Sequence, residues 1–237
     1  RHIREHHIDL RLETELKEIL PDSTGRVRAV ITSTGEEIPC ELVGLTAGVS
    51  PNVDFLRNTE LNVNRGVRVD AFFQTNIPDV YAIGDCAEFE TSPAADRKTI
   101  EQVWYTGRMH GETLAYNLCK NPVPYQPGIW FNSAKFFDIE YQTYGTVPPT
   151  WDEGNVKSFY WEHSVGKVCF RMLMNASGQI LGVNNFGFRL RHEFFDQAIR
   201  EKWSGEKVIS KLDKANFDPE FFAPYYMEIQ KAFKAQF

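Results

Sequence analysis

The stretch Thr75-Asn-Ile-Pro-Asp-Val-Tyr-Ala-Ile-Gly-Asp-Cys-Ala-Glu88 decides which fold this sequence predicts. At its centre, the apolar run 80–83 lies between Pro78 and Gly84, a pattern typical of a strand that is covered on both faces in a parallel sheet. Ligands of open α/β sheets gather at the carboxyl ends of such strands. Gly84 lets a backbone approach a bulky group, and Asp85 places an acceptor-only carboxylate there. We therefore predict a site for a polyhydroxy chain, with capping of the next segment's free amides by Asp85 as the alternative.

The same stretch resembles the late FAD motif of the pyridine nucleotide-disulfide oxidoreductase superfamily. These two-dinucleotide flavoproteins include ferredoxin reductases, rubredoxin reductases and apoptosis-inducing factor. Their motif is Thr followed by Pro-x-hydrophobic-Tyr-Ala-hydrophobic-Gly-Asp, and the matching residues here are Thr75, Pro78, Tyr81, Ala82, Gly84 and Asp85. The resemblance implies that Asp85 holds the ribityl chain of FAD.

Two neighbouring segments extend the resemblance in the order that the family has. Residues 42–52 read as a buried strand followed by a turn, and they resemble the crossover from the NAD domain back to the FAD domain. Residues 66–70 alternate as a half-buried strand does, and they stand where the family has a strand before the Gly-Asp motif.

The glycine-rich turn that binds a dinucleotide pyrophosphate is missing from this sequence. No G-x-G-x-x-G occurs, and the nearest candidate, 182–187, has the wrong spacing and follows the Gly-Asp motif instead of preceding it. The sequence also begins at Arg1, on what reads as the tail of a helix. We therefore expect a carboxyl-terminal portion of a longer polypeptide.

Composition bounds the class of protein. The 237 residues are 42% hydrophobic and 24% charged, which is enough for a sizeable core in one to three domains. The formal net charge of -6 disfavours nucleic acid as a partner, and no apolar run approaches the roughly 18 residues of a membrane span. The four cysteines have no metal-ligand spacing, so we predict no metal site and a cytoplasmic location, with Cys86 as a structural residue.

The first predicted domain, residues 1–52, is the end of an NAD(P)H-binding domain. Alternation over 8–13, with strands expected at 27–31 and 38–42, predicts a meander, which the resemblance places at the close of that domain. His2 and His6 have the spacing of a helical metal pair, but no third ligand is evident, so a solvated helix face is the preferred interpretation.

The second predicted domain, residues 53–121, is the second half of an FAD-binding domain. Residues 99–118 predict a helix whose glycines, Gly107 and Gly111, share one face and favour close packing on a sheet. In the related proteins the start of this helix points at the pyrimidine end of the flavin, where its dipole stabilises negative charge. By that resemblance the backbone amides of the cofactor-binding residues Glu101, Gln102 and Val103 act there.

The third predicted domain, residues 122–237, is α+β and begins at a proline-rich turn. Residues 129–145 resemble the ferredoxin-reductase segment whose Trp lies against the flavin, with Asn132 at the matching position. Strands are expected at 156–160, 167–174 and 179–186 as an antiparallel meander, followed by a helix over 189–203. The aromatic tail is either core or an interface, and comprises Phe217, Phe221, Phe222, Tyr225, Tyr226 and Phe233.

The fold class that follows is α/β and α+β: partial FAD- and NAD(P)-binding domains and a carboxyl-terminal α+β domain. The function implied is that of a flavin-dependent NAD(P)H oxidoreductase that passes electrons through FAD to an unidentified acceptor. No residue of this chain is expected to act as catalytic acid or base, and the isolated chain is expected to be inactive and to bind FAD weakly or not at all. We also expect a homodimer. The alternative is a non-catalytic dimerisation or electron-partner docking module.

Overall fold

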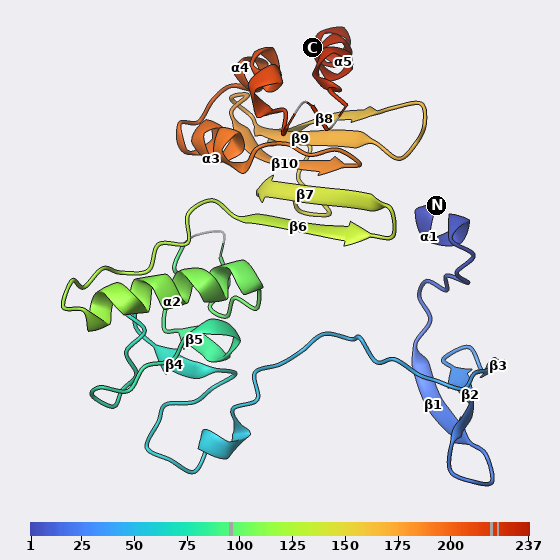
Figure 1. Ribbon diagram of the computed structural model, residues 1–237, viewed down its shortest axis with the longest axis vertical. Coiled ribbons are helices and arrows are strands. Elements are labelled where there is room, and N and C mark those ends of the chain that lie inside the picture. Colours follow the sequence, from blue (N-terminus) through green and yellow to red (C-terminus); the bar gives the residue numbers. More distant parts are fainter. Residues whose placement is uncertain (95–96, 219, 222) are drawn as a thin grey trace. The chain divides into compact units, whose positions relative to one another are not determined.

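The computed structural model describes residues 1–94, 97–218, 220–221 and 223–237, which form two compact units, 1–50 and 51–237 (Figure 1). Phe222 of the aromatic tail lies outside the described residues. The predicted mixture of α/β and α+β structure is confirmed, because a parallel strand pair with a helix and two antiparallel sheets occur in one chain. None of the helices in the described ranges is both long and apolar enough to cross a membrane.

The first unit is a three-stranded antiparallel sheet in the order β1-β2-β3. A short helix, α1 (His2–Glu5), precedes β1 (Leu16–Pro21), β2 (Val27–Thr32) and β3 (Glu37–Pro39). The β1–β2 turn is held by the Asp22 carboxylate, which accepts hydrogen bonds from the amides of Thr24 (2.7 Å) and Arg26 (3.0 Å). The predicted strand over 8–13 is wrong. The ladder with β2 begins only at Leu16, and Glu13 has a left-handed φ of 55° that a strand does not tolerate.

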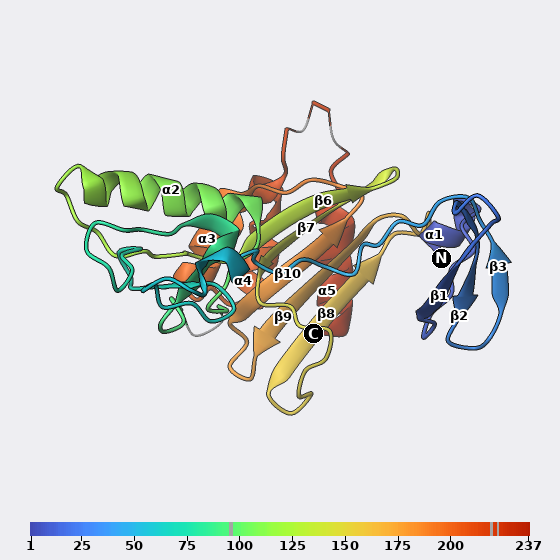
Figure 2. The ribbon, with the colours of Figure 1, turned by 90° about the horizontal axis from the view of Figure 1, so that it is seen from below.

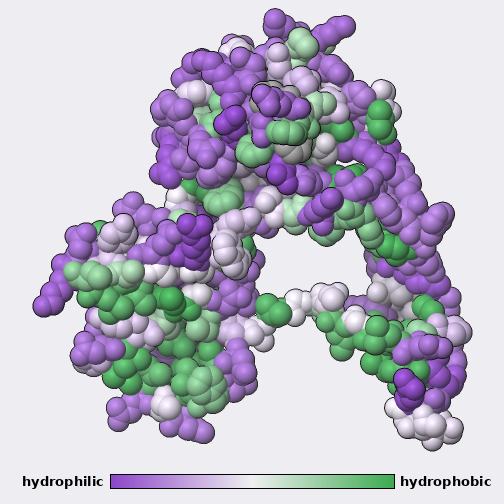
Figure 3. Space-filling view, in the orientation of Figure 1, coloured by the Kyte–Doolittle hydropathy of each residue, from purple (hydrophilic) through white to green (hydrophobic). Residues whose placement is uncertain are grey.

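The predicted buried strand at the start of 42–52 is also wrong. This segment forms no strand, and Leu42, Leu45 and Val49 are 86%, 73% and 77% exposed. Figure 3 shows the resulting hydrophobic surface along the segment where it leaves β3. Apolar residues predict burial only where a neighbouring strand accepts their backbone hydrogen bonds, and the described residues supply no such neighbour here.

The second unit begins with a small parallel α/β layer. It contains the 3-10 turn η1 (Asp54–Leu56), the strand β4 (Val67–Val69), the 3-10 turn η2 (Gly84–Cys86), the strand β5 (Ala87–Phe89) and the helix α2 (Trp104–Leu118). β4 and β5 pair in parallel, which confirms the strand predicted within 66–70. Their core consists of Val69, Phe73, Ala87, Phe89 and Tyr125.

The apolar run 80–83 is not the predicted buried strand. Its backbone is used locally: Thr75 donates to the Val80 carbonyl at 2.9 Å, and Ala82 donates to the Phe73 carbonyl at 3.1 Å. These two hydrogen bonds form a single isolated antiparallel β-bridge, between Gln74 and Tyr81, and not a strand ladder. Parallel pairing begins four residues later, at β5, so the Gly-Asp motif precedes the strand instead of following it.

A five-stranded antiparallel sheet in the order β6-β7-β10-β9-β8 forms the rest of the second unit. Its strands are β6 (Phe131–Phe136), β7 (Ile139–Gly145), β8 (Val156–Glu162), β9 (Cys169–Asn175) and β10 (Ile180–Phe186). The predicted meander is confirmed as β8-β9-β10, and the hairpin β6-β7 extends it because β10 also pairs with β7. The helices α3 (His192–Arg200), α4 (Gly205–Ser210) and α5 (Tyr226–Gln236), with the 3-10 turn η3 (Leu212–Ala215), cover one face (Figures 1 and 2).

The described part of the aromatic tail divides between core and surface. Phe233 is buried in the main core under the sheet, and Tyr225 and Tyr226 pack against that core. Phe217 and Phe221 are 38% and 76% exposed. The tail is therefore mainly structural, with two aromatic rings on the surface.

Candidate functional site

In the Gly84-Asp85 turn, Gly84 is half-buried and Asp85 is exposed. Gly84 has a φ of +74°, the left-handed conformation that glycine adopts without strain, and η2 follows directly. Asp85 is exposed, and no described residue donates a hydrogen bond to its carboxylate. The alternative that Asp85 caps the free amides of the next segment is therefore wrong, because none of the described amides donates to its carboxylate. An exposed carboxylate with no internal partner is available to hydroxyl groups of a ligand.

The helix α2 begins beside this turn. A Cβ placed on Gly107 would lie 3.7 Å from the Gly84 Cα, so the first helical glycine allows close packing, but against this turn and not against the predicted sheet. No atom lies within 4 Å of the equivalent position at Gly111, so the second glycine is not needed for packing. The first amides of any helix have no intrahelical acceptor. In α2, which follows Val103, no described side chain caps them either.

A single histidine joins the turn to the residues that precede α2. His110 is completely buried, and its Nδ1 accepts a hydrogen bond of 3.1 Å from the Gly84 amide. Its Nε2 lies 3.6 Å from Glu101 Oε2. The structure thus links two of the predicted site segments, Gly84-Asp85 and 101–103, through a residue that the sequence interpretation did not use.

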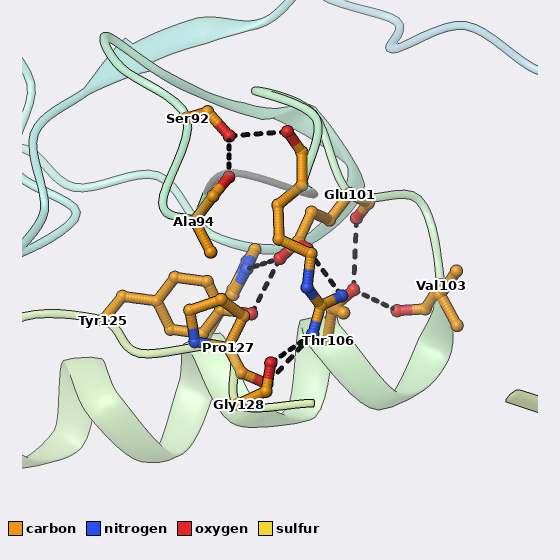
Figure 4. A network of polar contacts seen from close by, with 10 residues as sticks. Ser92, Ala94, Glu101, Val103, Thr106, Tyr125, Pro127 and Gly128 are labelled. Carbon is orange, nitrogen blue, oxygen red and sulfur yellow. Dashed lines mark hydrogen bonds and ion pairs between the residues drawn. The ribbon is translucent and has the colours of Figure 1, made fainter. Parts of the chain in front are cut away.

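Glu101 is the centre of a buried polar network behind the start of α2 (Figure 4). Its carboxylate accepts hydrogen bonds from Arg97 Nη1 at 2.9 Å and from the Tyr125 hydroxyl at 2.7 Å. The side chains of Arg97 and Glu101 are only 4% and 3% exposed. Arg97 also donates to the carbonyls of Pro127 (3.0 Å) and Gly128 (3.3 Å), so the pair fixes the segment that leads into the large sheet.

The network keeps Glu101 ionised and Tyr125 protonated. Burial by itself raises the pKa of Glu101, but the neighbouring His110 and Tyr125 and the charge of Arg97 lower it by more, so that the pKa lies below its ordinary value. Burial and the bond to Glu101 raise the pKa of Tyr125 far above its ordinary value. Neither group changes protonation near neutral pH, which suits a structural anion better than an acid or base.

A pocket of ≈ 450 Å³ lies between these residues and the large sheet. Arg97, at its wall, lies 4.8 Å from the centre of the Trp130 ring, a cation–π contact. Three predicted cofactor-binding residues, Glu101, Gln102 and Val103, line the pocket; the other lining residues are Arg97, Lys98, Ile100, Trp130, Thr143, Gly145, Thr146, Val147 and Pro148.

Asn132 lies on β6 near the start of α2 but outside the lining of this pocket. Its Oδ1 accepts a hydrogen bond of 2.9 Å from the Ser133 amide. Ser133 Oγ is 3.3 Å from the Tyr105 hydroxyl, and the Phe131 and Tyr105 rings are 4.8 Å apart. The beginning of β6 therefore packs on the first turn of α2 through Phe131 and Ser133. Asn132 is paired across the sheet with Thr143, which lines the pocket.

Sequence reasoning missed Arg97, His110 and Tyr125. Arg97 and Glu101 have the spacing of an ion pair, i and i+4, but that spacing alone indicates an exposed pair of little consequence. A lone histidine on a helix carries no signal of its own. Tyr125 lies 24 positions after Glu101, so only folding brings the two together.

Comparison with known proteins finds one family model that matches residues 1–111, described as pyridine nucleotide-disulphide oxidoreductase. The ferredoxin–NAD(+) reductase component of the p-cumate 2,3-dioxygenase system of Pseudomonas putida is 33% identical over 128 residues, 54% of this chain and 30% of that protein. The ferredoxin reductase subunit of 5,5'-dehydrodivanillate O-demethylase of a Sphingobium species is 32% identical over 142 residues, 60% of this chain and 34% of that protein.

Two structures share the fold over nearly the whole chain. An NAD-dependent persulfide reductase from A. fulgidus has a TM-score of 0.76 at 18% identity, covering 99% of this chain and 46% of that one. An FAD-dependent pyridine nucleotide-disulphide oxidoreductase from Desulfovibrio vulgaris has a TM-score of 0.67 at 19% identity, covering 94% of this chain and 54% of that one. The chain therefore spans about a third of the curated relatives and about half of the matched structures.

Proposed function

Because residues 1–111 belong to the pyridine nucleotide-disulphide oxidoreductases, we propose that this chain forms part of a flavin-dependent NAD(P)H oxidoreductase. The observation that carries the proposal is the exposed carboxylate of Asp85, to which no residue in the described ranges donates, on a glycine turn packed against the start of α2. Acceptor-only oxygens on an open turn suit the hydroxyl groups of a ribityl chain.

The residues present fit a flavin in two ways. Asp85 would hold the ribityl chain, and the uncapped amides at the start of α2, after 101–103, would face the electron-rich end of the ring, where a helix N-terminus favours negative charge. The pocket beside Glu101, Gln102 and Val103 offers the space, and Asn132 lies near it on β6. When bound, FAD supplies the redox chemistry. The chain itself binds, orients and provides a fixed electrostatic environment.

NAD(P)H would be the electron donor, and the names of the two curated relatives favour a ferredoxin as acceptor. We assign residues 1–52 to the end of an NAD(P)H-binding domain, 53–121 to the second half of an FAD-binding domain and 122–237 to an interface-like domain. A cytoplasmic homodimer is part of the same proposal.

The isolated 237-residue chain should be inactive and should bind FAD weakly, because it has no glycine-rich turn for the pyrophosphate. Adding FAD to the purified chain, followed by gel filtration with absorbance detection, should leave the flavin in the free fraction. Stoichiometric co-elution of flavin with the chain would contradict this part of the proposal.

A positive test uses the whole reading frame that encodes this chain. Its product should contain FAD and reduce a dye with NAD(P)H, and Asp85→Asn should weaken FAD retention while Asp79→Asn, a matched change in the same stretch, should not. A product that binds no flavin would overturn the proposed function.

A docking module is the second candidate, and one surface feature favours it. On the outer face of the large sheet, the rings of Phe136 and Tyr141 stack at 5.6 Å, and those of Tyr141 and Phe186 stack at the same distance. Phe136 and Phe186 are 59% and 37% exposed. Light scattering of the chain tests this candidate: a monodisperse dimer that Phe136→Ser dissociates supports it, and a soluble monomer argues against it.

A further inference from the structure

His110 connects the Gly84-Asp85 turn with the buried network. The side chain is 0% exposed, and its ring packs among Phe73, Phe89 and Tyr125 at centroid distances of 4.8, 5.5 and 4.6 Å. An apolar, fully packed position would ordinarily hold a hydrophobic side chain. Burying a polar ring in such a place costs free energy of folding, unless its nitrogens have hydrogen-bond partners.

The two ring nitrogens face different groups. The Gly84 N–H points at Nδ1, with the nitrogens 3.1 Å apart, so Nδ1 must offer its lone pair and the ring hydrogen must lie on Nε2. Nε2 lies 3.6 Å from Glu101 Oε2, slightly beyond hydrogen-bond distance, and it makes no hydrogen bond within the described part of the chain, so this carboxylate is the polar group beside that hydrogen. A backbone donor on one side and a carboxylate on the other select one tautomer.

This bond fixes the turn together with the close approach of Gly84 to Gly107. Gly84 contributes no side chain, nothing lies within 4 Å of its Cβ position, and its φ of +74° is not enforced by glycine, which adopts many conformations. The bond from the Gly84 amide to His110 is the hydrogen bond that joins the turn to α2 among the described residues. Asp85 follows Gly84 directly within η2, so the position of the Gly84 backbone also places the Asp85 backbone.

We propose that His110 is a positioning residue of this site: it carries the fixed geometry of the Glu101 network to the Gly84 amide and so aims Asp85 at a hydroxyl-bearing ligand. The part of this inference that concerns Asp85 and the ligand rests on the proposed function. The Gly84–His110–Glu101 linkage itself is a property of the chain without any ligand.

The first test examines that linkage in the 237-residue chain. A nitrogen–proton NMR spectrum should show His110 protonated at Nε2 and not at Nδ1. His110→Leu should accelerate exchange of the Gly84 amide by about tenfold, while His110→Asn, whose Oδ1 can replace Nδ1 as acceptor, should stay within about threefold of the wild type. The control, Val208→Ala, removes buried volume from the separate core under the large sheet and should leave Gly84 exchange unchanged.

A hydrogen on Nδ1, or equal Gly84 exchange in His110→Leu and Val208→Ala, would overturn the linkage. If His110→Leu does not fold, His110→Asn and the wild-type tautomer still decide the question, because both are measured in proteins with the acceptor present.

The second test measures FAD affinity in the product of the whole reading frame. His110→Leu should weaken FAD binding by about tenfold and His110→Asn by much less. Equal affinities in His110→Leu and the wild type, with the NMR results as expected, would overturn the positioning role alone. Absence of FAD binding in the wild type would instead overturn the proposed function and leave the linkage standing.

Discussion

The two carboxylates of the candidate site occupy opposite environments. Asp85 is exposed and has no hydrogen-bond donor among the described residues, whereas Glu101 is 5% exposed and is held by Arg97 and Tyr125. A buried charge is tolerated only with partners, so Glu101 is committed to the structure. An exposed charge that makes no internal bond adds little to stability. The difference indicates that Glu101 stabilises the structure of the site, whereas Asp85 remains available to a ligand.

Removing the buried carboxylate should have the largest effect. Glu101→Ala leaves the Arg97 guanidinium buried without its partner, which should lower the free energy of unfolding by about 3–5 kcal/mol in urea titrations. Glu112→Ala is the control, because it breaks an exposed pair with Arg108 on the same helix and should cost below about 1 kcal/mol. Equal losses in the two variants would remove the distinction between the buried and exposed carboxylates.

Removing one donor to Glu101 should have an intermediate effect. Tyr125→Phe deletes the 2.7 Å bond to the carboxylate and should cost about 1.5–3 kcal/mol of unfolding free energy, as hydrogen bonds to charged groups do. The matched change, Tyr160→Phe, deletes the exposed 2.9 Å hydrogen bond that the Tyr160 hydroxyl donates to Glu162 on β8. We expect this change to lower the free energy of unfolding by less than about 1 kcal/mol. A neutral Tyr125→Phe would show that Glu101 is satisfied without the hydroxyl.

Acid should weaken the second unit through Glu101, by a smaller amount. Since folding lowers the pKa of this carboxyl below the ordinary value of 4.5, its contribution is complete above pH 4.5 and is lost as the pH falls through the folded-state pKa. Unfolding titrations between pH 7 and acid should therefore show a steeper loss for the wild type than for Glu101→Gln. Parallel curves would mean that Glu101 binds its proton alike in the folded and unfolded chain.

Changing the exposed carboxylate should barely alter stability. Asp85→Asn should shift the unfolding free energy by no more than about 0.5 kcal/mol, because no internal hydrogen bond is lost. Thermal denaturation of the 237-residue chain measures this. A loss as large as that of Tyr125→Phe would show that Asp85 is structural after all, and would weaken its proposed role toward FAD.

The predictions from sequence succeeded where the signal is local. The strand within 66–70 and the meander over 156–186 follow from residue periodicity and turn residues within a few positions. The helices predicted over 99–118 and 189–203 also form, but they begin only at Trp104 and His192, and the second ends at Arg200. They failed at 42–45 and 80–83, because an apolar run specifies that a segment prefers burial but not which strand will pair with it. In the second case, hydrogen bonds within 73–82 replaced the parallel ladder.

The candidate site divides along the same line. The Gly84-Asp85 motif is written in consecutive residues, and it resembles the family whose model matches residues 1–111. Arg97, His110 and Tyr125 gave no such signal, because their roles depend on distances that arise only when the chain has folded.

The sequence by itself determined the turn: glycine for a positive φ, and aspartate for an exposed acceptor beside it. Only the tertiary structure decided that Glu101, expected to serve through its backbone, is a buried anion linked to that turn through His110. The physical reason is that backbone conformation is set by neighbours in the chain, whereas the cost of burying a charge is set by whatever packs around it.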